Sequence, residues 1–229
     1  MVGLGVHLSE PGAESYNAVL SALKLGYRHI DTAQYYEIEA DVGRAIRDCG
    51  IPREAIFVTT KLFIDKWGYE KALVATKESN EKLGLGYIDL YLLYAPGDIG
   101  VSNFDEAYLG KLLKTAKVKP AVNQVEPHPW MMRPSLVKYC KMHGILLEAY
   151  SPLARACKMD DPTLVAIAND VGATAAQVLV AFSLTNDFIT LPKSTNPGRQ
   201  KKQLRGADKL AALDEYLVTG WDPTKDHAV

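Results

Sequence analysis

Gly26-Tyr-Arg-His-Ile-Asp-Thr-Ala-Gln-Tyr-Tyr36 places a carboxylate at the end of a short apolar run and a phenol in the loop that follows. Asp31 ends the run His29–Asp31, which we predict to be a strand, and a second predicted strand, Phe57–Lys61, ends in a lysine. The pKa of a phenol is about 10, and a cation held beside it by a carboxylate favours the phenolate. The three groups can therefore form a proton donor for work near neutral pH; strand-end charges that only face solvent are the simpler alternative.

Short β-rich runs alternate with amphipathic helical patterns along the whole chain. The predicted strands are Val2–Val6, His29–Asp31, Phe57–Lys61, Asp89–Tyr94, Ile99–Val101, Ala121–Val125, Leu146–Tyr150 and Ile189–Pro192. The predicted helices include Ala13–Leu25, Ala40–Asp48, Tyr69–Leu83, Phe104–Lys114, Pro134–His143 and Ala173–Leu184. Eight strands with helical connections favour an α/β fold of the closed (β/α)8 TIM barrel type. We expect one domain over residues 1–229, with no clear helical pattern just before the tail that starts near residue 207.

Polar and aromatic side chains recur at or just after the ends of the predicted strands. They are Asp31, Lys61, Tyr94, Ser102, Gln124, Tyr150 and Lys193. In a parallel barrel the C-terminal strand ends meet at one face, which is where active sites are built. A doubly wound open sheet is the competing architecture. However, Gly3-Leu-Gly5 and Gly84-Leu-Gly86 lack the third glycine and the strand-to-helix setting of a dinucleotide fingerprint.

The stretch between the predicted strands Asp89–Tyr94 and Ile99–Val101 does not fit a complete barrel. Only Ala95-Pro-Gly-Asp98 separates the two strands, whereas a parallel crossover needs about a dozen residues and usually contains a helix. A barrel without that helix would expose an apolar sheet face, which favours a segment missing from the sequence after Asp98 over a truly short barrel. For the sequence as it stands, we predict a barrel without the crossover helix between its fourth and fifth strands.

The composition indicates a small-molecule enzyme or binding protein. Charged residues make up 23% of the chain, and the net charge is −1, which argues against a nucleic-acid partner. Cys49, Cys140 and Cys157 are an odd number with no tight pairing, as expected in a reducing compartment. We see no leader peptide and no apolar stretch of about 20 residues, so we expect a cytoplasmic protein with no membrane partner. The histidines show no metal-ligand spacing, and we expect no metal.

A set of motifs in fixed order resembles the aldo-keto reductase superfamily, and within it the prostaglandin F synthase and small-aldehyde reductase group. The motifs are Gly26–Ala33 with Tyr36, Val58–Lys61, Tyr87–Leu93, Ile99–Phe104, Val122–Glu126, Ala149–Leu153 and Leu191–Ser194. The resemblance implies a monomeric oxidoreductase of the alcohol dehydrogenase (NADP+) type that uses NADPH to reduce small aldehydes or ketones to alcohols by hydride transfer.

The resemblance also implies roles for individual residues. The catalytic group comprises Tyr36 as general acid, Lys61 and Asp31 as the pair that tunes it, and Tyr94. The cofactor-binding group comprises Ser102, Asn103 and Gln124 for the nicotinamide carboxamide, Tyr150 for stacking on the ring, Ser151 and Leu153, and Lys193, Ser194 and Arg199 for the adenosine phosphate. The family normally carries a histidine where this chain has Tyr94, and a tyrosine titrates far above neutrality. We therefore expect reduced or redirected activity.

Two other functions remain compatible with the sequence. The first is a cofactor-binding protein with weak or no turnover, such as a redox sensor or a partner subunit, which the tyrosine at position 94 and the short crossover would suit. The second is a barrel aldolase or isomerase in which Lys61 forms a Schiff base with its substrate.

Overall fold

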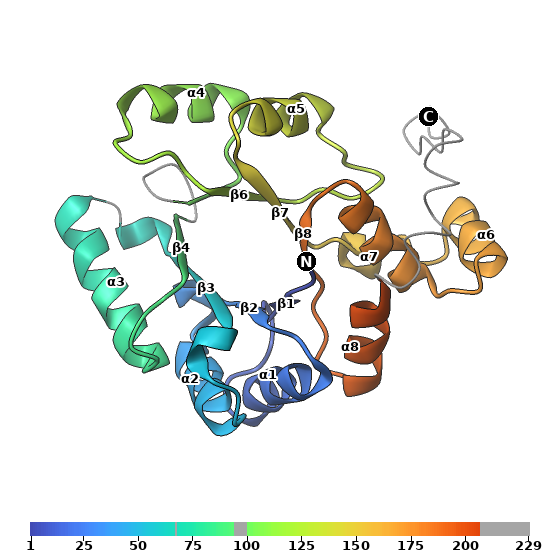
Figure 1. Cartoon of the computed structure of the whole chain (residues 1–229), viewed down its shortest axis with the longest axis horizontal. Coiled ribbons are helices and arrows are strands. Elements are labelled where there is room, and N and C mark those ends of the chain that lie inside the picture. The colour runs from blue at the N-terminus through green and yellow to red at the C-terminus, as the bar shows by residue number, and fades with distance from the viewer. Residues whose placement is uncertain (67, 94–99, 207–229) are drawn as a thin grey trace.

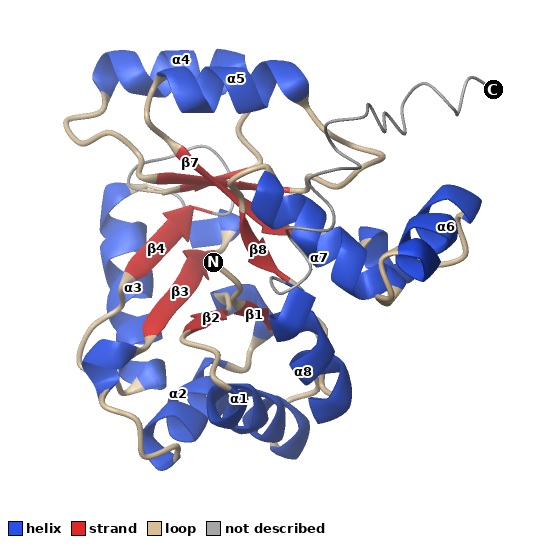
Figure 2. Cartoon of the chain, turned by 45° about the vertical axis from the view of Figure 1, so that its right-hand side comes forward, coloured by secondary structure: helices blue, strands red, loops and turns tan. Residues whose placement is uncertain are grey.

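Eight parallel strands form the centre of the molecule, and the helices surround them (Figure 1 and Figure 2). The structure is a computed structural model that describes residues 1–66, 68–93 and 100–206. The strands are hydrogen-bonded in chain order from β1 to β8. Two parallel bridges, Val2 with Thr190 and Gly5 with Lys193, connect the eighth strand back to the first. The predicted (β/α)8 barrel is therefore confirmed.

The strands and helices agree closely with the sequence pattern. The strands are β1 (Leu4–Gly5), β2 (His29–Asp31), β3 (Phe57–Leu62), β4 (Leu90–Leu93), β5 (Val101–Ser102), β6 (Val122–Val125), β7 (Leu146–Tyr150) and β8 (Ile189–Leu191). The helices are α1 (Ala13–Leu25), α2 (Glu39–Asp48), α3 (Tyr69–Leu83), α4 (Glu106–Thr115), α5 (Pro134–Met142), α6 (Pro162–Asp170), α7 (Ala175–Thr185) and α8 (Pro197–Leu204). Most predicted boundaries lie within two residues of the observed ones.

The sequence pattern misses α8. We expected no clear helix just before the tail, and that expectation was wrong. The buried side chains of α8 are Gln200 and Gln203, so the helix carries no apolar stripe for a periodicity search to find. Its start is marked instead by Pro197 in the first turn and by the side chain of Asn196, which accepts a hydrogen bond from the backbone of Arg199. The prediction also omits α6, whose start has the same construction.

The connection between β4 and β5 is short, as expected. β5 pairs with β4 in parallel through Leu93 and Val101, and no helix lies between the two strands among the described residues. The connection occupies residues 94–100, of which 94–99 lie outside the described part. The strand order of the barrel is thus preserved across the shortened crossover.

Alternate residues of the first three strands point outward into an apolar layer beneath α1 and α2. Leu4, Ile30 and Val58 lie side by side in register and are fully buried, as are Val19 and Val42 from the two helices. Because side chains alternate along a strand, the residues between them face the barrel interior. The charged residues of β2 and β3 are thereby directed inward.

No single helix in the described part of the chain is both long and apolar enough to cross a membrane. The helices α6 and α7 satisfy those criteria only when taken together, and they are bent by 89° at the break between them.

Gly43 allows α2 to approach α3, and replacing it should destabilise the barrel. A Cβ at Gly43 would overlap the backbone carbonyl of Leu83 at the end of α3. We expect Gly43→Ala to lower the free energy of unfolding by about 1–3 kcal/mol, because the two helices must separate. The matched control is Gly110→Ala within α4, where the nearest contact would be the Tyr139 hydroxyl at 3.3 Å. That change should be neutral or stabilising by up to about 1 kcal/mol. Urea unfolding measures the free energy of unfolding of both variants, and equal values for the two would contradict this role for Gly43.

Candidate active site

Lys61 and Asp31 form a buried ion pair inside the barrel. Lys61 Nζ donates hydrogen bonds to Asp31 Oδ1 at 2.7 Å and to the backbone oxygen of Thr32 at 2.8 Å. Only 1% of Lys61 and 4% of Asp31 is exposed. Burial opposes the charge on the ammonium, but the Asp31 carboxylate outweighs that effect and holds the pKa of Lys61 above its usual value. Lys61 is therefore a fixed cation at the end of β3.

The Tyr36 side chain lies beside this cation. Tyr36 ends a short 3-10 turn, Gln34–Tyr36, that follows β2, and Lys61 Nζ lies 5.3 Å from the centre of its ring. The ring of His7 packs on Tyr36 at a centroid distance of 4.9 Å. Burial and the nearby Lys61 lower the pKa of His7, so this imidazole is neutral at neutral pH. The structure brings together the acid, the ammonium and the phenol that the sequence predicts.

Gln124 connects the ion pair to a second buried carboxyl group that the sequence analysis missed. Its amide nitrogen, Nε2, donates to Asp31 Oδ2 at 2.8 Å and to Glu148 Oε2 at 2.6 Å. Glu148 on β7 is fully buried, and its Oε1 lies 3.4 Å from His29 Nε2. The available signal was position: Glu148 precedes Tyr150 by two residues on one strand, so both face the same side of the sheet.

Burial shifts the pKa values of the two groups at the far end of this network. Burial and the neighbouring Asp31 carboxylate raise the pKa of Glu148 to about 8, and burial lowers the pKa of His29 to about 4. His29 is consequently neutral at neutral pH. Its Nε2 lies 2.9 Å from Thr59 Oγ1, whereas Nδ1 has no hydrogen-bond partner among the described residues.

Three of the predicted cofactor residues form a hydrogen-bonded chain where β5 and β7 end. Asn103 Nδ2 donates to Ser102 Oγ at 3.2 Å, and the Tyr150 hydroxyl donates to Asn103 Oδ1 at 3.0 Å. Asn103 has a left-handed backbone with φ of 60°, a conformation that asparagine tolerates better than most residues. Ser102 also pairs in register with Gln124, so this chain adjoins the buried network.

The residues predicted to bind the adenosine phosphate lie around the start of α8. Lys193 Nζ donates to the backbone oxygen of Leu8 at 3.3 Å. Ser194 is buried, and its hydroxyl donates to the Asn196 backbone oxygen, so it shapes the turn into the helix. Arg199 lies in the first turn of α8. Neither Lys193 nor Arg199 forms an ion pair with any residue in the described part of the chain, which leaves two cations beside a helix N-terminus.

The remaining predicted site residues are less closely connected. Ser151 has a left-handed backbone with φ of 47° directly after β7, and its backbone oxygen accepts from Ala154. Leu153 packs on the apolar cluster of α6 and α7. No hydrogen bond links either residue to Lys61 or Tyr36 in the described part. Tyr94 lies outside the described residues.

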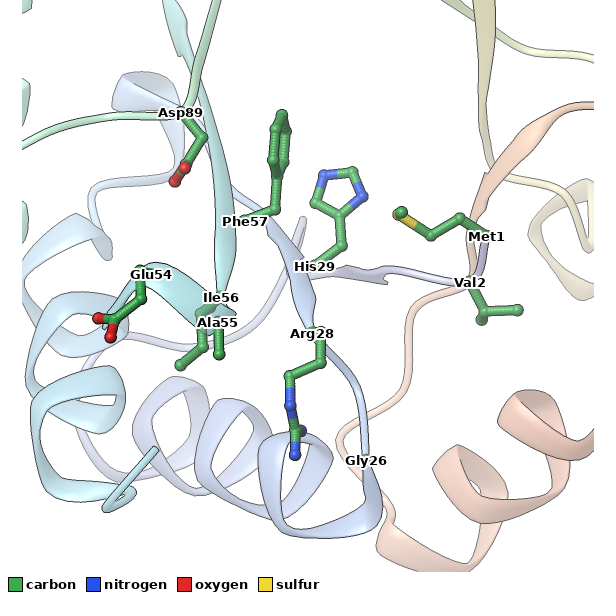
Figure 3. Close-up of a pocket in the computed structure, with 10 residues that line it drawn as sticks. All are labelled: Met1, Val2, Gly26, Arg28, His29, Glu54, Ala55, Ile56, Phe57 and Asp89. Carbon is green, nitrogen blue, oxygen red and sulfur yellow. The ribbon is translucent and has the colours of Figure 1, made fainter. Parts of the chain in front are cut away.

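A cavity of about 350 Å³ lies at the end of the barrel where the strands begin, opposite the end that carries Tyr36 and Lys61 (Figure 3). Its lining includes His29, Phe57 and Asp89, which lie at or just before the starts of β2, β3 and β4. The N-terminal face of such barrels generally serves stability. The cavity touches the buried network through His29, whereas Tyr36 and Lys61 do not line it. It is therefore distinct from the candidate active site.

No group of three or more His, Cys, Asp and Glu side chains is arranged to hold a metal ion in the part of the chain that the structure describes. Cys49, Cys140 and Cys157 are all free thiols.

Comparison with known proteins identifies one family. A model of the "Aldo/keto reductase family" matches residues 5–98 and 96–222, and the break between the two matches coincides with the short connection after β4. A 9,11-endoperoxide prostaglandin H2 reductase of Trypanosoma cruzi is 42% identical over 255 aligned residues, covering 97% of this chain and 90% of the relative. A glyoxal reductase of Bacillus subtilis is 41% identical over 218 residues, covering 86% of this chain and 79% of the relative.

Solved structures lead to the same family. An aldo-keto reductase from a deep-sea metagenome library superposes with a TM-score of 0.87 and 37% identity, covering 93% of this chain and 90% of that one. A Bombyx mori aldo-keto reductase in complex with NADP gives a TM-score of 0.83 and 32% identity, covering 94% and 88%. The alignment with the trypanosomal relative is longer than the 229 residues of this chain. That relative therefore carries segments that this chain lacks.

The raised pKa of Glu148 predicts a pH-dependent stability difference. The folded protein keeps the Glu148 proton up to about pH 8, whereas the unfolded chain releases it near 4.5. Unfolding between these values releases a proton, so the free energy of unfolding of the wild type falls as pH rises, by up to about 1.4 kcal/mol per pH unit. Glu148→Gln should therefore gain stability relative to the wild type from pH 5 to pH 8. Urea unfolding of both proteins at several pH values tests this. A difference in the free energy of unfolding that stays constant with pH would contradict it.

Proposed function

The chain belongs to the aldo/keto reductase family, and we propose that it reduces an aldehyde or ketone to an alcohol with NADPH, using Tyr36 as the proton donor. The observation that carries this assignment is the Lys61 ammonium, held 2.7 Å from Asp31 and 5.3 Å from the centre of the Tyr36 ring. This is the arrangement in which a phenol can act as an acid near neutral pH.

The nicotinamide cofactor, when bound, supplies a hydride to the carbonyl carbon of the substrate. Tyr36 donates its hydroxyl proton to the carbonyl oxygen, on which negative charge develops. The phenolate that remains is stabilised by Lys61, and Asp31 keeps Lys61 charged and in place. General-acid catalysis of this kind contributes roughly 10²–10⁴-fold in rate. The neutral His7 ring forms the wall of the site beside Tyr36.

The residues around the barrel mouth fit this cofactor. Both hydrogen bonds of the Gln124 amide are donated by its nitrogen, and its Oε1 accepts none from any residue that the structure describes. This oxygen would accept from the carboxamide of a bound nicotinamide, with Ser102 and Asn103 on the neighbouring strand end as further partners. Lys193 and Arg199 lack carboxylate partners in the described part, and an arginine binds phosphate through paired, charge-assisted contacts. This favours a phosphorylated adenosine and hence NADPH.

Several finer assignments complete the proposal. We assign Tyr150 to stacking on the nicotinamide ring, Ser151 and Leu153 to further cofactor contacts, and Ser194 to the phosphate site with Lys193 and Arg199. We assign Tyr94 to the substrate carbonyl in place of the usual histidine. The enzyme is of the alcohol dehydrogenase (NADP+) type and acts on small aldehydes or ketones as a monomer. One domain spans residues 1–229, and the three free thiols suit the reducing cytoplasm.

The proton donor is tested by substituting Tyr36 and, as a control, the tyrosine before it. We expect Tyr36→Phe to lower the rate of NADPH oxidation with a reactive aromatic aldehyde by at least about 100-fold, while NADPH still binds. Tyr35→Phe removes the same atom from a ring that stacks on Phe63 at 4.8 Å, and it should retain turnover.

Tyr94→His should raise the rate above that of the parent.

Other outcomes would point elsewhere. NADPH binding without turnover in the parent would favour the cofactor-binding protein over the reductase. Turnover that persists in Tyr36→Phe would contradict the proposed proton donor. Trapping of a carbonyl substrate on Lys61 by borohydride would identify the Schiff-base enzyme instead.

A further inference from the structure

We propose that Glu148 is a positioning residue: together with Asp31 it fixes the plane and direction of the Gln124 amide, so that Gln124 presents its oxygen to the carboxamide of the cofactor. The inference rests on the proposed function for its ligand. It concerns a carboxyl group that the mechanism does not use.

The strand register brings Glu148 to Gln124. In the sheet, Ser102 of β5 pairs with Gln124 of β6, and Gln124 pairs with Glu148 of β7. Side chains of register partners on parallel strands lie on the same face of the sheet, and all three are at least 97% buried. Glu148 thus reaches Gln124 from one side, while Asp31 of β2 reaches it from across the barrel interior.

Gln124 donates both hydrogen bonds, to Asp31 and to Glu148, from the same atom, Nε2. An amide NH2 group has two hydrogens, and here each points to a different carboxyl oxygen, at 2.8 Å and 2.6 Å. If the amide were reversed, its oxygen would face the Asp31 carboxylate, and two acceptors would oppose each other. The nitrogen therefore faces inward. Two acceptors also define the plane of the NH2 group, so the direction of Oε1 is fixed as well.

Asp31 alone would leave this amide free to turn. Its Oδ1 is engaged by Lys61, so only Oδ2 is available to Gln124. With one acceptor the amide can rotate about a single N–H···O axis, and its second hydrogen is left buried without a partner. An unsatisfied buried donor costs about 1–3 kcal/mol. Other orientations of the Gln124 amide would then become favourable. Glu148 supplies the acceptor that prevents this.

A cofactor analogue measures the direction of Oε1. The reduced 3-acetylpyridine analogue of NADPH has a methyl group where the carboxamide has its NH2, so it cannot donate to Gln124 Oε1. One net hydrogen bond is worth about 0.5–1.5 kcal/mol, or roughly two- to tenfold in the dissociation constant. The wild type should bind NADPH more tightly than the analogue by that factor, as measured by fluorescence titration without substrate.

Three variants separate positioning from general destabilisation. Glu148→Leu removes the acceptor and should bring the ratio of the two dissociation constants close to one. Glu148→Gln offers an amide oxygen as acceptor and should retain the wild-type ratio. Glu39→Leu is the matched control, because Glu39 is another buried glutamate whose side chain accepts a hydrogen bond from a barrel strand, from Thr60 at 2.7 Å. It should leave the ratio unchanged, even if both affinities fall.

The outcomes distinguish this inference from the proposed function. Failure of the wild type to bind NADPH would overturn the proposed function itself. Binding of NADPH with no preference over the analogue, or a wild-type ratio in Glu148→Leu, would overturn only the role of Glu148. Should Glu148→Leu not fold, Glu148→Met takes its place. In the wild type, NMR should also find both Gln124 side-chain amide protons protected from solvent exchange, and rapid exchange of the pair would overturn the inference.

Discussion

The buried pair of Lys61 and Asp31 is the interaction on which the rest of the site depends. Removing two charges from water costs several kcal/mol per ion, and only close contact and further hydrogen bonds compensate for that cost. Here Lys61 bonds both Asp31 and the backbone of Thr32, while the second oxygen of Asp31 accepts from Gln124. The same pair thus places a cation beside Tyr36 and, through Asp31, provides one of the two acceptors of the Gln124 amide. Loss of either charge would leave the other buried without its partner.

The barrel separates stability from chemistry by the alternation of its strands. Outward residues such as Ile30 and Val58 form the apolar layer under the helices, and inward residues such as Asp31 and Gln124 form the polar network. A parallel strand order directs all the inward strand ends to one mouth. The shortened connection between β4 and β5 leaves this order intact, which explains how the site persists in a chain lacking segments that its relative carries.

Much of the fold was readable from the sequence, because strand periodicity and strand-end residues are local signals. Asp31 and Lys61 were predicted as neighbours from those signals alone, while roles for Asn103 and Arg199 came from the family resemblance. The sequence did not reveal Glu148, since its partner Gln124 lies on another strand. The pairing between two strands cannot be inferred from the sequence of either strand alone. It also did not reveal α8, whose buried face is made of Gln200 and Gln203. Polar residues buried against distant partners escape a search for apolar periodicity.

The most direct test of the account is the pH dependence of kcat/KM in the wild type and in Lys61→Met. If Lys61 stabilises the Tyr36 phenolate, removing the ammonium makes the phenol harder to ionise. The alkaline limb of the profile should then move to higher pH in Lys61→Met, and it should stay there in the double variant that also carries Asp31→Asn. An alkaline limb at the same pH in all three proteins would contradict the claim that the buried pair tunes the proton donor.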